Sequence, residues 1–171
     1  MLPKAVLDPG IFNRWGPDFA VEHGLVLACN DGAVMTVGFG HRYPSVEVWS
    51  TSRVDQPWRV DDEGIDAVSD LLHAAHVAVS DDVPANEEWH YRPMGTGVPV
   101  PWRIILKLRT STLAGFEGGT KIYVNTISPT TLAAMLLPKL FEARAAGRIA
   151  AINLGDECEI PRGVLAVTRE R

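Results

Sequence analysis

The sequence has little cysteine, no surplus of basic residues and no long apolar run, and each shortage excludes a class of protein. Its two cysteines, Cys29 and Cys158, are too few among 171 residues for a fold held together by disulfides, and we expect both to be thiols. The formal net charge of −5 gives no general basic surface for nucleic acid. The longest apolar run, TLAAMLLPKLF, is interrupted by Pro138 and Lys139, so we expect no membrane-spanning helix.

The established catalytic and nucleotide-binding motifs are also missing. The sequence contains no Gly-x-Ser-x-Gly elbow, Cys-x-x-Cys pair, His-Glu-x-x-His, phosphate loop or dinucleotide fingerprint. The first ten residues, MLPKAVLDPG, carry proline and aspartate where a signal peptide needs an apolar stretch. We therefore expect a cytoplasmic protein of a bacterium or an infected host cell, without a cofactor. The excess of Arg over Lys indicates a GC-rich genome, such as that of an actinobacterium or a phage.

What the sequence does contain is a clear pattern of strands and helices. Two apolar runs within residues 23–40 flank Asn-Asp-Gly at 30–32, which is typical of a tight hairpin. SVEVWS at 45–50 alternates, with Glu47 and Trp49 on one face and valines on the other, and predicts a third strand. Residues 61–80 have apolar side chains at helical spacing behind an acidic first turn, which predicts an amphipathic helix.

The second half repeats this order in outline. RIILKLRT at 103–110 predicts a strand, and TKIYVNT at 120–126 predicts its antiparallel partner. A second helix should begin after Ser128 as N-cap and end at Gly147, and two final strands should follow at 148–154 and 163–169. We therefore predict one α+β domain over residues 1–171, with a mostly antiparallel sheet of six to seven strands and two main helices. Residues 1–22 should form an irregular N-terminal arm with at most a short helical turn.

Residues 87–104, EEWHYRPMGTGVPVPWRI, combine aromatic and arginine side chains with proline and glycine. Such side chains dominate binding hot spots, because large rigid rings bury much area at a low entropy cost. A contact surface, a loop packed on its own sheet and an active-site lid are all compatible with this composition. The predicted partner-binding residues of this segment are Trp89, His90, Tyr91, Arg92 and Trp102.

The second predicted helix is apolar nearly all round. Leu136, Leu137 and Phe141 point in too many directions for a single apolar stripe, and Pro138 predicts a kink. The helix is therefore either buried on both sides within this chain or buried on one side by another chain. The second alternative adds these three side chains to the predicted partner-binding residues.

Polar residues that could carry chemistry lie at a few separate places. His41 follows two glycines that would let a ligand approach the backbone, and His90 lies in the aromatic segment. Asp156 and Glu157 follow a predicted strand, so they should lie at the rim of the sheet. These four residues are the catalytic candidates. We predict no metal site, because two further histidines on the first predicted helix have no third ligand nearby.

The missing catalytic motifs favour a non-enzymatic interaction or assembly protein that binds another protein or a second copy of itself. The Asp-Gly hairpin followed by an amphipathic helix is loosely similar to small bacterial immunity proteins, and adaptor proteins of phage tails share this α+β pattern. These resemblances imply a protein-binding, immunity or viral role. The alternative is a small hydrolase or metal-dependent enzyme that uses His and Asp/Glu at a sheet rim. Nucleic-acid binding through Arg103, Lys107 and Arg109 is disfavoured by the net charge.

Overall fold

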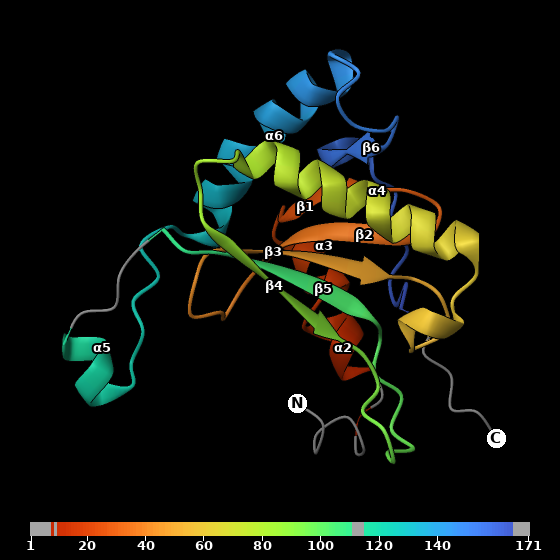
Figure 1. Ribbon diagram of the computed structural model, residues 1–171, viewed down its shortest axis with the longest axis horizontal. Coiled ribbons are helices and arrows are strands. Elements are labelled where there is room, and N and C mark those ends of the chain that lie inside the picture. The colour runs from red at the N-terminus through yellow and green to blue at the C-terminus, as the bar shows by residue number, and fades with distance from the viewer. Residues whose placement is uncertain (1–7, 9, 111–114, 166–171) are drawn as a thin grey trace.

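The computed structural model describes residues 8, 10–110 and 115–165. Its centre is an antiparallel sheet with the strand order β4-β5-β3-β2-β1-β6 (Figure 1). The strands are β1 (Val26–Cys29), β2 (Ala33–Gly38), β3 (Ser45–Ser50), β4 (Ala85–His90), β5 (Arg103–Leu108) and β6 (Asn153–Leu154). With its helices the chain has an α+β fold, which confirms the fold class predicted from the sequence.

The predicted Asn-Asp-Gly hairpin joins β1 to β2. The side-chain oxygen of Asn30 accepts hydrogen bonds from the backbone N–H groups of Gly32 and Ala33, at 3.2 and 2.9 Å. Its amide nitrogen donates to the carbonyl of Ala67 at 2.8 Å. One asparagine therefore closes the turn and also attaches it to the helix that packs above the sheet.

Two long helices, α4 (Asp62–Val79) and α6 (Pro129–Ala145), cover one face of the sheet (Figure 1). Ser128, the predicted N-cap of α6, accepts from the N–H of Thr131 at 3.1 Å, and Asp61, predicted only as part of an acidic helix start, caps α4 by accepting from the N–H of Gly64 at 3.0 Å. Gly147 follows α6 with a φ of +66°, a conformation that favours glycine. Local sequence signals therefore indicated where both helices begin, by a cap for α6 and by apolar spacing behind acidic residues for α4.

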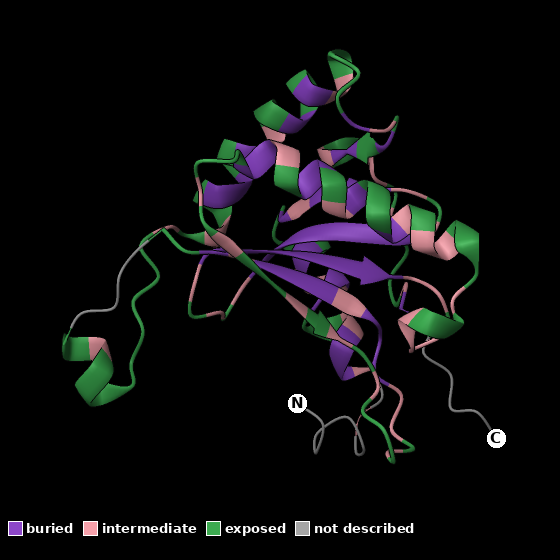
Figure 2. Cartoon of the chain, viewed as in Figure 1, coloured by how far each residue is buried: buried purple, intermediate pink, exposed green. Residues whose placement is uncertain are grey.

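The main core lies between these helices and the sheet (Figure 2). Leu71 of α4 and Leu140 of α6 are completely enclosed there, together with Met35 and Ile104 from the strands. Helix α6 buries one side and leaves Met135 and Phe141 about half exposed. Helix α6 is therefore buried on the side that faces the sheet and exposed to solvent on the other side.

The other face of the sheet carries a smaller core at one end. Ile11 and Phe12 of α2 (Ile11–Arg14) pack there against Trp49, and α3 (Pro17–Glu22) follows. The backbone of Leu165 hydrogen bonds to the side chain of Asn13 in both directions, at 2.8 and 3.0 Å. The region predicted as an irregular arm thus contains two short helices, because its aromatic and aliphatic side chains have a sheet surface to cover.

The remaining elements differ most from the sequence prediction. Strand β4 includes the first four residues of the segment 87–104, which was interpreted as a loop, so the connection from β4 to β5 is residues 91–102. Residues 120–126 form no strand; the short helix α5 (Gly115–Thr120) and the residues after it project away from the sheet (Figure 1). Of the two final strands, the first is reduced to β6, and residues 163–165 are not in a strand; the rest of the second lies outside the described residues. In the described ranges, no helix is long and apolar enough to cross a bilayer.

Candidate functional site

Six charged or titratable side chains gather on the face of the sheet opposite α4 and α6. They come from β3, β4, β5 and the turn after β2, and we call them the charged face: His41, Glu47, Glu88, His90, Arg103 and Lys107. Alternation along the strands explains this arrangement, because the neighbouring residues Val48 and Ile104 point into the main core.

Strand register places these side chains opposite one another. Glu47 of β3 and Glu88 of β4 both pair with Ile105 of β5, and His90 pairs with Arg103. Paired residues of antiparallel strands point to the same face, and diagonal neighbours are within reach of long side chains. Each carboxylate therefore has a cation of β5 beside it.

Glu47 is the buried centre of the charged face, with its side chain only 4% exposed. Its Oε1 lies 2.7 Å from Nε2 of His41 and 3.4 Å from a guanidinium nitrogen of Arg103. The same guanidinium lies over the ring of Trp49, 4.4 Å from its centre. Burial lowers the pKa of Arg103, an effect that the charges of Glu47 and Glu88 oppose. A buried carboxylate with two basic partners is a costly arrangement unless each member is compensated.

The outer part of the charged face is more open. Lys107 donates to Oε1 of Glu88 at 2.5 Å, and this hydrogen bond lowers the pKa of Glu88. Nε2 of His90 lies 3.4 Å from the other oxygen of Glu88. Burial and the nearby charge of Arg103 lower the pKa of His90 below its ordinary value of 6.5, although Glu88 acts in the opposite direction. His90 is therefore mainly neutral at pH 7, and its ring can accept a proton or attack an electrophile.

Gly38 at the end of β2 makes room for His41. A Cβ atom at position 38 would lie 2.7 Å from Cδ2 of His41, closer than side chains can approach. The sequence analysis assigned this glycine to the approach of a ligand. In the structure the group that approaches the backbone is an imidazole of the same chain.

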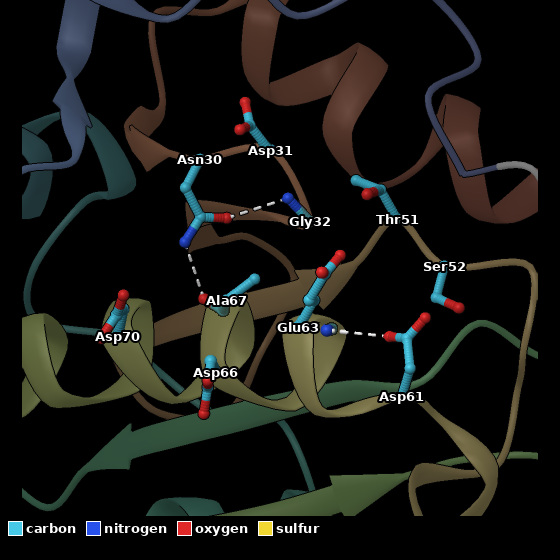
Figure 3. Close-up of a pocket in the computed structure, with 11 residues that line it drawn as sticks. Asn30, Asp31, Gly32, Thr51, Ser52, Asp61, Glu63, Asp66, Ala67 and Asp70 are labelled. Carbon is cyan, nitrogen blue, oxygen red and sulfur yellow. Dashed lines mark hydrogen bonds between the residues drawn. The ribbon is translucent and has the colours of Figure 1, made fainter.

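The hollow drawn in Figure 3 lies between the β1–β2 turn, the end of β3 and the first turns of α4, and has a volume of about 600 Å³. Its lining contains no basic residue and five carboxylates, those of Asp31, Asp61, Glu63, Asp66 and Asp70. The side chains of Asn30 and Asp61 are used in the turn and the helix cap (Figure 3). Because carboxylates repel phosphate, this pocket is a poor site for a phosphorylated ligand.

A metal centre is not supported either. Across residues 8, 10–110 and 115–165, no group of three or more His, Cys, Asp or Glu side chains is arranged to hold an ion. His76, which could have been a ligand, instead lies 2.7 Å from Oε1 of Glu87.

A family model described as a domain of unknown function, DUF4921, matches residues 3–167. The chain belongs to this family. No curated protein is significantly similar to it in sequence.

The fold of this DUF4921 chain is similar to several solved structures. A uridylyltransferase has a TM-score of 0.66 and 16% identity, over 83% of this chain and 49% of that chain. An ADP-glucose phosphorylase from Arabidopsis thaliana, solved with bound ADP-glucose, has a TM-score of 0.60 and 20% identity, over 68% of this chain and 41% of that chain. The DUF4921 chain therefore spans about half the length of these enzymes, and the likeness at such low identity concerns the fold.

These similarities contradict the expectation of a non-enzymatic assembly, viral or immunity protein. That expectation rested on missing catalytic motifs and on a general α+β pattern, whereas the similar folds are those of uridylyltransferases and a phosphorylase. They favour the alternative derived from the sequence, an enzyme that uses histidine and acidic residues.

The catalytic candidates of the sequence analysis separate into two groups. His41 and His90 both lie on the charged face, whereas Asp156 and Glu157 lie in η2 (Gly155–Glu157), beyond β6 at the opposite edge of the sheet. Glu157 accepts hydrogen bonds from Arg144, at 2.8 Å for one nitrogen, and from the N–H of Leu154 at 2.9 Å. The two carboxylates therefore cannot act together with the histidines.

The predicted partner-binding residues are also divided. Trp102 is 2% exposed and Leu136 is 4% exposed, and both pack in the main core, so neither offers a surface to a partner. Arg92 and Leu137 are partly buried. The exposed members are Trp89, His90, Tyr91 and Phe141.

Glu47, Glu88 and Arg103 belong to the charged face but were not among the catalytic candidates predicted from the sequence. Alternation had already placed Glu47 on the face opposite the valines, and Arg103 and Lys107 on the outward face of their strand. The missing step was the pairing of β3 with β5, two strands separated by more than fifty residues. Had this pairing been known, Glu47 and Arg103 would have been placed side by side on one face of the sheet, which would have indicated a site.

Proposed function

We propose that this chain supplies a nucleotide-binding part of an enzyme that transfers a group at a nucleotide phosphate, as a transferase or phosphorylase. The phosphates would lie on the charged face. The observation that carries the proposal is a half-exposed, neutral His90 beside Arg103 and Lys107, on a fold similar to that of uridylyltransferases. The chain covers only about half of each such enzyme. We therefore also propose, as a separate point, that the chain is active by itself.

The charged face has the chemical groups that such a reaction needs. Transfer at phosphorus develops negative charge on the phosphate oxygens, which fixed cations stabilise. Lys107 and Arg103 supply these cations on one face of β5, where Ile105 lies between them. Glu47 holds Arg103 in place from the buried side, and so acts as a positioning residue. His90 would act as the proton acceptor or the nucleophile, and both roles need the unprotonated ring.

The first prediction concerns His90→Asn. With a nucleoside diphosphate sugar and either phosphate or a sugar phosphate as acceptor, we expect this change to lower kcat by about 10²- to 10⁴-fold. Turnover is measured by separating the nucleotides chromatographically. The kcat/KM of the unchanged chain should rise with pH below 6.5, as His90 loses its proton.

His73→Asn is the matched control, because His73 is an exposed histidine on α4, on the opposite side of the sheet. It should retain turnover within about twofold. The proposal fails if the chain neither binds nor converts UDP-sugars or ADP-sugars at millimolar concentration. It also fails if His90→Asn turns over as fast as the control.

A further inference from the structure

Three arginines meet in a cleft of about 300 Å³ next to the charged face. Its lining, which we call the arginine cleft, consists of Arg53, Val54, Asp55, Arg59, Arg92, Gly97 and Pro99. The arginines come from the segment after β3 and from the loop after β4, the two strands that carry Glu47 and His90. Arg92 is only two residues beyond His90 in the chain.

The cleft is electropositive, in contrast to the chain as a whole. The lining of the cleft contains three arginines and one carboxylate, that of Asp55, whereas the chain has a net charge of −5. Guanidinium groups keep their charge at every physiological pH and present N–H donors that match phosphate oxygens. The wall composition therefore selects an anion.

The two loops that form the cleft are tied together. The backbone N–H of Arg92 donates to the carbonyl of Asp55 at 3.1 Å. In the side chains, Nε of Arg92 lies 3.0 Å from Oδ2 of Asp55. That contact lacks hydrogen-bond geometry, so the buried Nε has no hydrogen-bond partner within the described part of the chain. Asp55 therefore compensates part of the charge of Arg92 and joins the two loops at the wall of the cleft.

Each loop is also ordered by its own hydrogen bonds. The N–H of Val54 donates to Oγ of Ser52 at 3.1 Å, and that of Val98 donates to Oγ1 of Thr96 at 3.1 Å. The 3₁₀ helix η1 (Pro57–Arg59) fixes the position of Arg59. The backbone segments that carry the arginines are therefore ordered before a ligand arrives, which lowers the entropy cost of binding.

Two aromatic rings adjoin the arginines. Trp58 precedes Arg59 and Tyr91 precedes Arg92, and the two rings meet edge to face with their centres 5.1 Å apart. Trp58 is held by this contact while 58% of it stays exposed. A rigid, exposed indole beside a cationic cleft is suited to stacking on a flat heterocycle.

We infer that the arginine cleft binds a nucleotide, with its phosphate on Arg53, Arg59 and Arg92 and its base on Trp58. This site goes beyond the proposed function, since it does not require any reaction on the charged face. The phosphate component should make binding weaker as the salt concentration rises.

The test uses the full chain labelled with 5-fluorotryptophan, in which Trp58 is one of five tryptophans. Its ¹⁹F resonance is assigned with Trp58→Phe and then followed during additions of AMP, inorganic phosphate and adenosine. We expect AMP to shift the Trp58 signal and to bind more tightly than the other two probes. Because the readout is the Trp58 signal and not turnover on the charged face, the result does not depend on whether the proposed function holds.

Variants of the cleft should change the affinity in opposite directions. Arg53→Gln and Arg59→Gln should each weaken AMP binding roughly tenfold, as expected for the loss of a charge-assisted hydrogen bond. Asp55→Asn should strengthen it a few-fold, because a competing carboxylate is removed. Arg148→Gln is the control: Arg148 is exposed after α6 and lies 3.7 Å from Glu142.

The inference is overturned if 10 mM AMP leaves the Trp58 resonance unmoved. It is also overturned if inorganic phosphate binds as tightly as AMP, or if Arg148→Gln weakens binding as much as Arg53→Gln does. A weaker affinity in an Asp55→Asn protein that keeps the normal unfolding midpoint would contradict the electrostatic argument.

Discussion

At the scale of single residues, the best-defined ion pair of the chain has a structural role. Glu157 accepts hydrogen bonds from two nitrogens of Arg144 and from the backbone N–H of Leu154. Arg144 also donates to the carbonyl of Ile152 at 2.8 Å. This pair therefore attaches the end of α6 to β6 and η2. Carboxylates in a turn after a strand looked like a rim site in the sequence, whereas here one of them serves as an anchor.

The Arg144 hydrogen bond and the Leu154 N–H lower the pKa of Glu157 from 4.5 to about 2. The pair therefore stabilises the fold fully above pH 4.5, and this contribution is lost as the pH falls toward 2, where the folded state also takes up the proton. We predict that Glu157→Gln is less stable than the unchanged chain at pH 6, and that the difference disappears near pH 2. Urea unfolding at a series of pH values measures it. A difference that is independent of pH would show that the charge of Glu157 is irrelevant.

At the scale of elements, α6 illustrates how an ambiguous sequence pattern is resolved by packing. The helix is apolar nearly all round, and its sequence allowed either full burial or a partner. The structure buries the side that carries Leu132, Leu136 and Leu140 against the sheet and α4, and it leaves Phe141 about half exposed. The buried leucines on successive turns should therefore contribute much more to the free energy of unfolding than an exposed neighbour such as Phe141.

Leu140→Ala should lower the free energy of unfolding by about 2–5 kcal/mol, because Leu140 is completely enclosed and its removal leaves a cavity. Phe141→Ala should cost about 1 kcal/mol, since much of its ring already contacts solvent. Chemical denaturation of both variants compares them on adjacent positions of one helix. An equal cost for the two changes would contradict the orientation of α6.

Elements with strong local signals could be predicted from the sequence. The Asn30 turn, the acidic start of α4, the cap at Ser128 and the alternation of β3 each depend on a few neighbouring residues. Strand β4 could not be predicted, because its residues ANEEWH are mostly polar, and it becomes a strand only by pairing with β5 at the sheet edge. The short helix α2 likewise depends on Trp49, a residue on a distant strand.

The same distinction explains the candidate site. His41 and His90 were identified as single residues, but their common face follows from pairings that no local pattern contains. A partner, a second copy of the chain and a cytoplasmic location stay predictions. The exposed side chains of Trp89 and Phe141 are compatible with an interface, whereas the burial of Trp102 and Leu136 removes two of the eight residues predicted to form one.

At the scale of the whole molecule, the pKa values of four groups, His90, Glu87, Glu88 and Glu157, are all lowered in the folded state. His90 has a lowered pKa, so below pH 6.5 the unfolded chain binds a proton that the folded chain binds only at lower pH. The pKa of Glu87 is lowered too: burial raises it, but hydrogen bonds from Trp89 and His76 lower it more. The pKa of Glu88 is lowered by Lys107, so Glu87, Glu88 and Glu157 all release their protons more readily in the folded state. Each of these groups makes folding less favourable as the pH falls.

We therefore predict that the free energy of unfolding decreases in two stages on acidification. The first begins below about pH 6.5 and is due to His90, whose neutral form is favoured by burial and by Arg103 in the folded state. The second begins below about pH 4.5 and is due to the glutamates. His90→Asn should abolish the first stage and leave the second, as measured by thermal unfolding between pH 8 and pH 3. If the variant retained both stages, the pKa of His90 would be the same in the folded and the unfolded chain. The argument that His90 is a neutral base on the charged face would then fail.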